Sequence, residues 1–198
     1  ERNRQRLLEA AREVFATQGV DVTLDDIARH AGLSVGALYR HFPNRELLVE
    51  ALFDTKLDRI VAWAAEAERD PDAWAGLTGF LERATEAMAD DRGLRDVLFS
   101  RAYGHDRVER SRERLAPAID ALVEHCRSAG VIRADLAGSD LALIQFMVAA
   151  LLEYTEPVDA GLWRRYLALV LNGLRHEDLP QHPLPHPAPD AQGVSEVA

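Results

Sequence analysis

The sequence has little cysteine, few β-branched residues and no long apolar run. Its single cysteine, Cys126, cannot form an internal disulfide, so nothing in the 198 residues calls for an oxidising compartment. No apolar run approaches the roughly 18 residues that cross a bilayer, and the start has no charged-then-apolar signal segment. We therefore expect no membrane association and a cytoplasmic location. The sequence leaves open whether an arm precedes Glu1.

Net positive charge is also missing, since the formal net charge is −10 at pH 7. This balance argues against a protein that coats nucleic acid through bulk charge, but it does not exclude a small local reader. Of the 23 basic residues only Lys56 is a lysine, and the others are arginine. Arginine is the better bidentate donor to phosphate and to guanine edges.

Alanine and leucine dominate, and most glycines and prolines stand at segment ends, which predicts an all-α chain. The periodicity predicts a first helix ending before Gly19 and further helices at about 24–31, 35–42, 44–67, 72–89, 93–102, 108–129, 139–154 and 159–175. Pro117 predicts a kink or break in the seventh. We expect three parts: a head (1–45), a body (46–178) and a disordered tail (179–198) that holds five of the nine prolines.

The head carries the spacing of a helix-turn-helix. Thr23 stands three residues before Asp26, as in a capping box that opens a helix. Ala28 supplies the small residue where two steeply crossing helices touch, and Gly32 supplies a turn residue tolerant of positive φ. Ser34 can then cap a second short helix, with Leu33 and Leu38 packing inward.

The outward face of that second helix suits a DNA duplex. Small side chains at its start allow close approach to base edges, and Arg45 at the next helix start can clamp the backbone. We expect the exposed set to be Ser34, Val35, Gly36, Ala37, Tyr39, Arg40 and His41. The alternative is a helical hairpin that only packs against the rest of the chain. The first fifty residues hold seven arginines and eight acidic residues, so the head as a whole is not basic.

The resemblance to a known family covers residues 7–49, which read LLEAAREVFATQGVDVTLDDIARHAGLSVGALYRHFPNRELLV. This run closely resembles the head of the tetracycline-repressor (TetR) family, although that family usually has lysine where Arg45 stands. The resemblance implies about nine helices, a three-helix DNA-binding head and a body that binds a small effector. It also implies a homodimeric regulator, usually a repressor, on a palindromic operator. By match to the motif, DNA is touched by Thr23, Ser34, Val35, Gly36, Ala37, Tyr39, Arg40, His41 and Arg45.

Two runs of the body, GVIRADLAGSDLALIQF and WRRYLALVLNGLR, look similar to one C-terminal subgroup of the same family. Aromatic and polar residues within apolar stretches are candidates for an effector pocket, with ordinary core packing as the alternative for each. The candidates are Trp63, Met88, Phe99, Tyr103, His125, Gln145, Phe146 and Tyr154. The helix from Asn44 is the one continuous link that the pattern offers between head and body, so we expect it to carry effector coupling.

The last two predicted helices carry apolar stripes wider than one packing seam requires. Such extra surface indicates a two-fold dimer, which would place two heads one DNA turn apart. The alternative is a monomer that buries both stripes. The stripe residues proposed for the interface are Leu141, Val148, Leu152, Trp163, Tyr166, Leu167, Val170, Leu171 and Leu174.

Other chemistry finds little support. His176, His182 and His186 fall in or beside a proline-rich tail without carboxylate or cysteine partners, so we expect no metal and no cofactor. Catalytic motifs such as G-x-S-x-G or H-E-x-x-H are missing, and Cys126 beside His125 is thin support for redox chemistry. The competing classes are a small-molecule-binding helical protein that has lost DNA binding and a helical-bundle enzyme.

Overall fold

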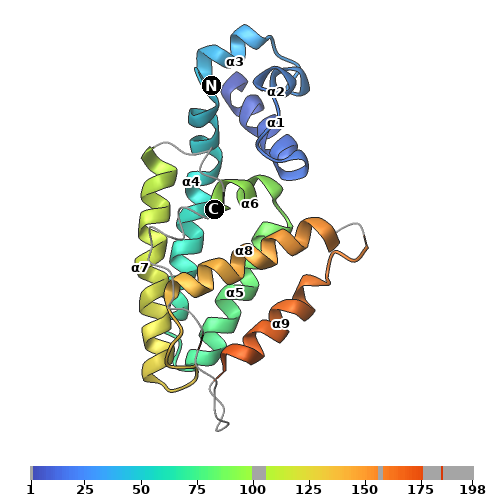
Figure 1. The fold of residues 1–198 in the computed structure, drawn as a ribbon. Coiled ribbons are helices and arrows are strands. Elements are labelled where there is room, and N and C mark those ends of the chain that lie inside the picture. Colours follow the sequence, from blue (N-terminus) through green and yellow to red (C-terminus); the bar gives the residue numbers. More distant parts are fainter. Residues whose placement is uncertain (1, 100–105, 156–157, 176–183, 185–198) are drawn as a thin grey trace. The chain divides into compact units, whose positions relative to one another are not determined.

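The computed structural model describes residues 2–99, 106–155, 158–175 and 184, with the backbone alone for 106–112. These residues form nine α-helices, and no strand is present among them (Figure 1). The all-α prediction is confirmed. The helices are α1 (Arg2–Gln18), α2 (Leu24–His30), α3 (Val35–His41), α4 (Arg45–Ala67), α5 (Ala73–Ala89), α6 (Arg92–Phe99), α7 (Asp106–Ser128), α8 (Gly138–Thr155) and α9 (Trp163–Leu174).

The chain divides into two compact units. The first combines Glu1–Asp58 with Asp90–Arg112, and the second combines Arg59–Ala89 with Glu113–Ala198. Helix α6 therefore packs with the head, although it lies in the middle of the sequence. Helix α7, like α4, contributes residues to both units. The expectation that the helix from Asn44 is the one continuous link was wrong, because α7 is a second.

The first unit is built around α1, whose buried face carries Leu7, Ala11 and Phe15. Phe15 stacks on Phe53 of α4 with ring centroids 6.2 Å apart. Helix α6 approaches both residues through Gly93, where an added Cβ would lie 2.8 Å from the Phe53 ring and 2.9 Å from the Phe15 Cβ. Glycine at this position thus allows α6 to pack directly against α1 and α4.

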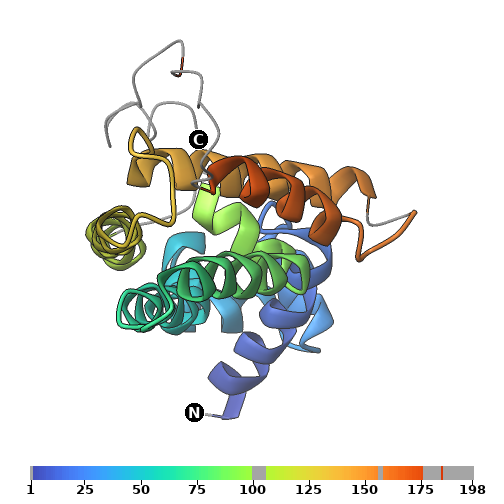
Figure 2. The same ribbon diagram turned by 90° about the horizontal axis from the view of Figure 1, so that it is seen from below.

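The second unit packs α5 against α8 and α9, and α8 and α9 lie side by side in both views (Figures 1 and 2). Its core includes Leu77, Leu141 and Trp163, all of which are buried. Inside this core Thr85 of α5 bonds to Gln145 of α8.

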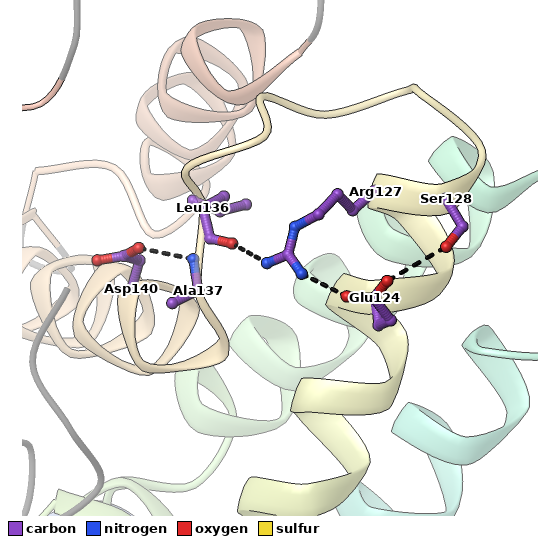
Figure 3. Close-up of polar contacts among 6 residues, drawn as sticks. All are labelled: Glu124, Arg127, Ser128, Leu136, Ala137 and Asp140. Atoms are coloured by element: carbon purple, nitrogen blue, oxygen red, sulfur yellow. Dashed lines mark hydrogen bonds and ion pairs between the residues drawn. The ribbon is translucent and has the colours of Figure 1, made fainter. Parts of the chain in front are cut away.

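The connection between α7 and α8 is held by Arg127 (Figure 3). The guanidinium donates to the Leu136 carbonyl at 2.6 Å and pairs with Glu124 one turn earlier. Asp140 accepts the Ala137 N–H at 2.8 Å, which caps the start of α8. Residues 131–137 therefore leave α7 along a fixed path.

Four sequence-based expectations differ from the structure, in whole or in part, or lie outside the described residues. Helix α9 begins at Trp163 rather than at Asp159, because the Asp159 carboxylate accepts the Gly161 N–H at 2.8 Å and holds a turn there. Helix α7 continues through Pro117, so the predicted break is wrong, while the alternative of a kink stays a prediction. The tail, apart from Leu184, lies outside the described residues, as does Tyr103.

Candidate nucleic-acid interface

Helix α2 starts at a side-chain cap, as the sequence predicted. Thr23 Oγ1 accepts the Asp26 N–H at 3.1 Å and donates to the Asp26 carboxylate at 2.5 Å. The hydroxyl of Thr23 lowers the pKa of Asp26, and the Arg29 guanidinium acts in the same direction. The acidic start of α2 thus satisfies orphan backbone donors and keeps its charge.

The turn between α2 and α3 depends on Gly32, which has φ +63°, a conformation that side chains rarely adopt. The N–H of Leu33 returns to the Ala28 carbonyl at 2.9 Å, closing the end of α2. Ala28 and Leu38 are fully buried where the two helices cross. The Arg6 guanidinium of α1 donates to the Ala31 carbonyl at 2.7 Å, a contact that the sequence reasoning missed.

Helix α3 presents most of the expected face. Ser34 caps it, since Oγ accepts the Ala37 N–H at 3.3 Å, and this bond leaves the hydroxyl hydrogen to donate elsewhere. Tyr39 is 45% exposed, and Ser34, Val35, Gly36, Arg40 and His41 are exposed as well. A Cβ added to Gly36 would meet nothing within 4 Å, so packing inside the chain does not require glycine there.

Ala37 does not share that exposure. It is 7% exposed and lies beside Leu38 on the inward side of α3, so the expectation of an exposed Ala37 was wrong. Successive side chains on a helix differ in direction by about 100°. Gly36 therefore lies on the outward side of α3, and the next residue, Ala37, points inward. Close approach at the start of α3 therefore depends on Gly36.

Arg45 begins α4 and is partly buried. Its Nη1 donates to the carbonyl of Val20, in the segment between α1 and α2. The N–H of the same Val20 donates to the carboxylate of Asp96 on α6 at 3.1 Å. Burial raises the pKa of Asp96, while the Val20 bond and Arg92 oppose that rise. No local pattern marks Asp96, because it lies 76 residues from Val20.

The described effector-pocket candidates belong to both units, and Tyr103 lies outside the described residues. Trp63 lies between Arg59 and Arg83, whose guanidinium carbons are 5.1 and 4.7 Å from the ring centroid. Tyr154 is 80% exposed, so the expectation that it lines a pocket was wrong for the single chain. Phe99 belongs to the first unit and Phe146 is partly buried in the second.

The other described candidates have internal partners in the second unit. Met88 is buried in its core. Gln145 binds both Thr85 and the Leu81 carbonyl. The His125 ring lies 3.1 Å from the Asp70 carbonyl oxygen.

Cys126 is buried, and this burial raises the pKa of its thiol to about 11, which keeps the thiol protonated. Among the residues described here, no cluster of three possible metal ligands occurs.

Seven of the nine residues proposed for the dimer interface pack inside their own chain instead, because α8 and α9 use them to cover the core. These are Leu141, Val148, Leu152, Trp163, Leu167, Leu171 and Leu174. Tyr166 is exposed and Val170 is partly so. The same helices expose other apolar side chains, namely Met147, Tyr154 and Leu169.

Across the described ranges no helix has the length and apolar run needed to cross a bilayer.

Comparison with known proteins matches both parts of the chain. Residues 7–52 match the profile of "Bacterial regulatory proteins, tetR family", and residues 70–176 match "Transcriptional regulator SbtR-like, C-terminal domain". The TetR transcriptional regulator SCO0520 from Streptomyces coelicolor, known from a crystal structure, is 32% identical to this chain in sequence. That match covers 87% of this chain and 98% of that one, with a TM-score of 0.59.

Two further matches extend the comparison. The transcriptional regulator SrpR of Pseudomonas putida is 29% identical over 69% of this chain. The fold is also that of SmeT, solved as a triclosan complex (21% identical, 94% of this chain and 100% of that one, TM-score 0.57). The chain spans less than two thirds of the first curated relatives that it matches, 58 and 66% of their lengths.

Proposed function

Because the chain belongs to the TetR family of DNA-binding transcription regulators, we propose that it is a homodimeric repressor released from a palindromic operator by a small molecule. The observation that carries this proposal is the exposed face of α3. This short helix is capped at Ser34 and presents Gly36, Tyr39 and Arg40 outward. A helix of this kind can enter a major groove about 12 Å wide.

Each exposed group has a chemical role in this proposal. Val35 and Gly36 lie against base edges, and Arg40 reaches a phosphate or a guanine. Ser34, Tyr39 and His41 donate to phosphate oxygens, as does Arg45 at the start of α4. Thr23 stays a DNA contact at the start of α2, although its hydroxyl hydrogen is given to Asp26. Ala37 supports the base-facing side from inside the helix pair.

We assign the remaining roles by unit. The predicted division stays part of the proposal: residues 1–45 bind DNA, residues 46–178 bind the effector and dimerise, and residues 179–198 form the tail. SmeT, which has the same fold, is solved with triclosan, and this supports a small-molecule effector for the body. The protein would act in the cytoplasm, where bacterial operators are found, without catalysis or a cofactor.

The dimer would form through the exposed apolar side chains of α8 and α9. Met147, Tyr154, Tyr166 and Leu169 lie on these two helices, which pack against each other within the chain. A two-fold axis beside them would create a four-helix interface. One head holds few basic groups for phosphate, so two linked heads would bind an operator more firmly than one.

The proposal is tested on an operator selected from genomic fragments by the purified protein. Arg40→Ala and Tyr39→Ala should each weaken specific binding in a mobility-shift assay by at least tenfold, because each removes a charged or aromatic-hydroxyl contact. Arg69→Ala, which removes an exposed arginine of the second unit, is the matched control and should bind like the parent chain. Undiminished binding by both α3 variants would contradict the assignment.

A second candidate is a small-molecule-binding protein whose head no longer binds DNA, which the even balance of charges in the head favours. A salt titration separates the two. Phosphate contacts make log K fall linearly with log salt concentration, by about 0.9 for each phosphate neutralised. A flat titration, with a ligand that still raises the melting temperature, would favour the second candidate.

A further inference from the structure

Both backbone polar groups of Val20, which belong to the two peptide units that flank it, are held by side chains from other helices. The N–H donates to Asp96 of α6, and the carbonyl accepts from Arg45 of α4. Val20 itself is fully buried, so these groups need protein partners. The segment between α1 and α2 is therefore fixed from two sides within the first unit.

The neighbouring residue is shaped to admit the Asp96 carboxylate. Gly19 has φ +80°, and a Cβ added there would overlap Asp96 Oδ2. Its own N–H closes α1 on the Phe15 carbonyl at 3.0 Å. Any other residue at position 19 would strain the backbone and displace the carboxylate, so the chain keeps room for this contact.

Helix α6 is docked firmly enough to place that carboxylate. Its N-terminus is capped by Asp91, which accepts the Leu94 N–H at 3.0 Å and pairs with Lys56 of α4. Gly93 brings the helix against Phe15 and Phe53. Asp96 follows one turn after the cap, on a helix anchored independently of Val20.

We propose that Asp96 is a positioning residue for operator binding, which acts through the backbone of Val20 on the guanidinium of Arg45. This inference rests on the proposed function, in which Arg45 contacts a DNA phosphate. A guanidinium has five N–H donors in one rigid plane. When Nη1 is held by the Val20 carbonyl, the plane is set and its other donors are oriented before DNA arrives.

The chemistry explains why arginine serves at this position. Arginine can bind a carbonyl with one nitrogen and a phosphate with another, whereas a lysine ammonium presents all its donors from a single atom. Preorganisation also spares the side-chain ordering that binding would otherwise cost. Without Asp96 the backbone on the N-terminal side of Val20 can shift, and the Val20 carbonyl that follows no longer holds the Arg45 guanidinium in one plane.

The test compares Asp96→Ala with Asp96→Asn in the 198-residue chain on a selected operator. Both variants remove the same charge, but asparagine keeps an oxygen that accepts the Val20 N–H. We expect the alanine variant to bind about tenfold more weakly, the effect of one charge-assisted bond. Its slope of log K against log salt should fall by about 0.9 per head. Asparagine should restore both values to within about twofold of the parent.

Controls separate this role from folding and from the proposed function. Lys56→Met removes the ion pair with Asp91 but keeps the Asp91 cap of α6 and the Asp96 bond to Val20, so it should lower the melting temperature and leave the salt slope unchanged. Arg45→Ala should reduce the slope by itself, and adding Asp96→Ala should reduce it no further. A parental slope for Asp96→Ala, beside a reduced one for Arg45→Ala, would overturn the inference alone. A parental slope for Arg45→Ala would overturn the phosphate contact itself.

Discussion

Thr85 and Gln145 join α5 to α8 by a side-chain hydrogen bond of 2.9 Å inside the apolar core of the second unit. The Gln145 amide also donates to the Leu81 carbonyl at 3.1 Å, and the Thr85 hydroxyl lies 2.7 Å from the same oxygen. The Leu81 carbonyl of α5 therefore accepts from α8, while the single hydroxyl hydrogen of Thr85 is donated to the Gln145 oxygen. Such a polar contact fixes how two apolar surfaces align, because sliding would leave buried donors without partners.

Replacing Thr85 with valine tests this pair. Valine keeps the shape but removes the hydroxyl, which leaves the Gln145 carbonyl oxygen buried without its donor. We expect the free energy of unfolding in urea to fall by about 1–3 kcal/mol. The double variant Thr85→Val/Gln145→Leu should lose less than the sum of the two single variants, because both partners are then apolar. Strictly additive losses would contradict a coupled pair.

The raised pKa of Asp96 predicts a pH dependence of stability. Burial is the main cause, Arg92 and Arg95 oppose it, and Asp21 adds to it. Because the folded-state pKa lies above the unfolded value of 3.8, the contribution of this group is fully present below pH 3.8. It is lost as the pH rises through the folded-state pKa.

Asp96→Asn removes that titration and should gain stability relative to the parent chain as the pH rises from the acid range towards neutrality. Melting temperatures measured across this range check the sign. A difference between variant and parent that does not change with pH would contradict the shift, while Asp26, whose pKa is lowered, titrates equally in both proteins.

The two faces of α9 should respond differently to substitution. Leu169 is 55% exposed, and Leu171 is 5% exposed in the core. Leu169→Arg should leave the fold intact and convert the proposed dimer to a monomer in sedimentation equilibrium. Leu171→Ala should instead lower the free energy of unfolding by about 2–5 kcal/mol and leave the association state unchanged. A Leu169→Arg protein that still sediments as a dimer would place the interface elsewhere.

The sequence predicted the local parts of the site and missed the distant ones. The caps at Thr23 and Ser34 and the turn at Gly32 depend on residues within five positions along the chain. Their spacing in the sequence is therefore enough to predict them. The Asp96 contact with Val20 joins residues 76 positions apart, and no periodicity encodes it. The sequence also failed to show which side of α8 is exposed. Met147 is exposed and Val148 is buried on a helix that is apolar nearly all round, where the pattern favours no side.

Gly36 gives the sharpest separation between folding and DNA binding. An added Cβ would meet nothing within 4 Å, so Gly36→Ala should raise the free energy of unfolding by about 0.5–1 kcal/mol through lower backbone entropy. The same methyl group would stand between α3 and the base edges, and operator affinity should fall in a mobility-shift assay. Gly79→Ala is the matched control, since Gly79 lies in α5 with the same open surroundings. It should gain similar stability and keep full affinity. A Gly36→Ala protein that binds as tightly as the parent would mean that the start of α3 does not approach the bases closely.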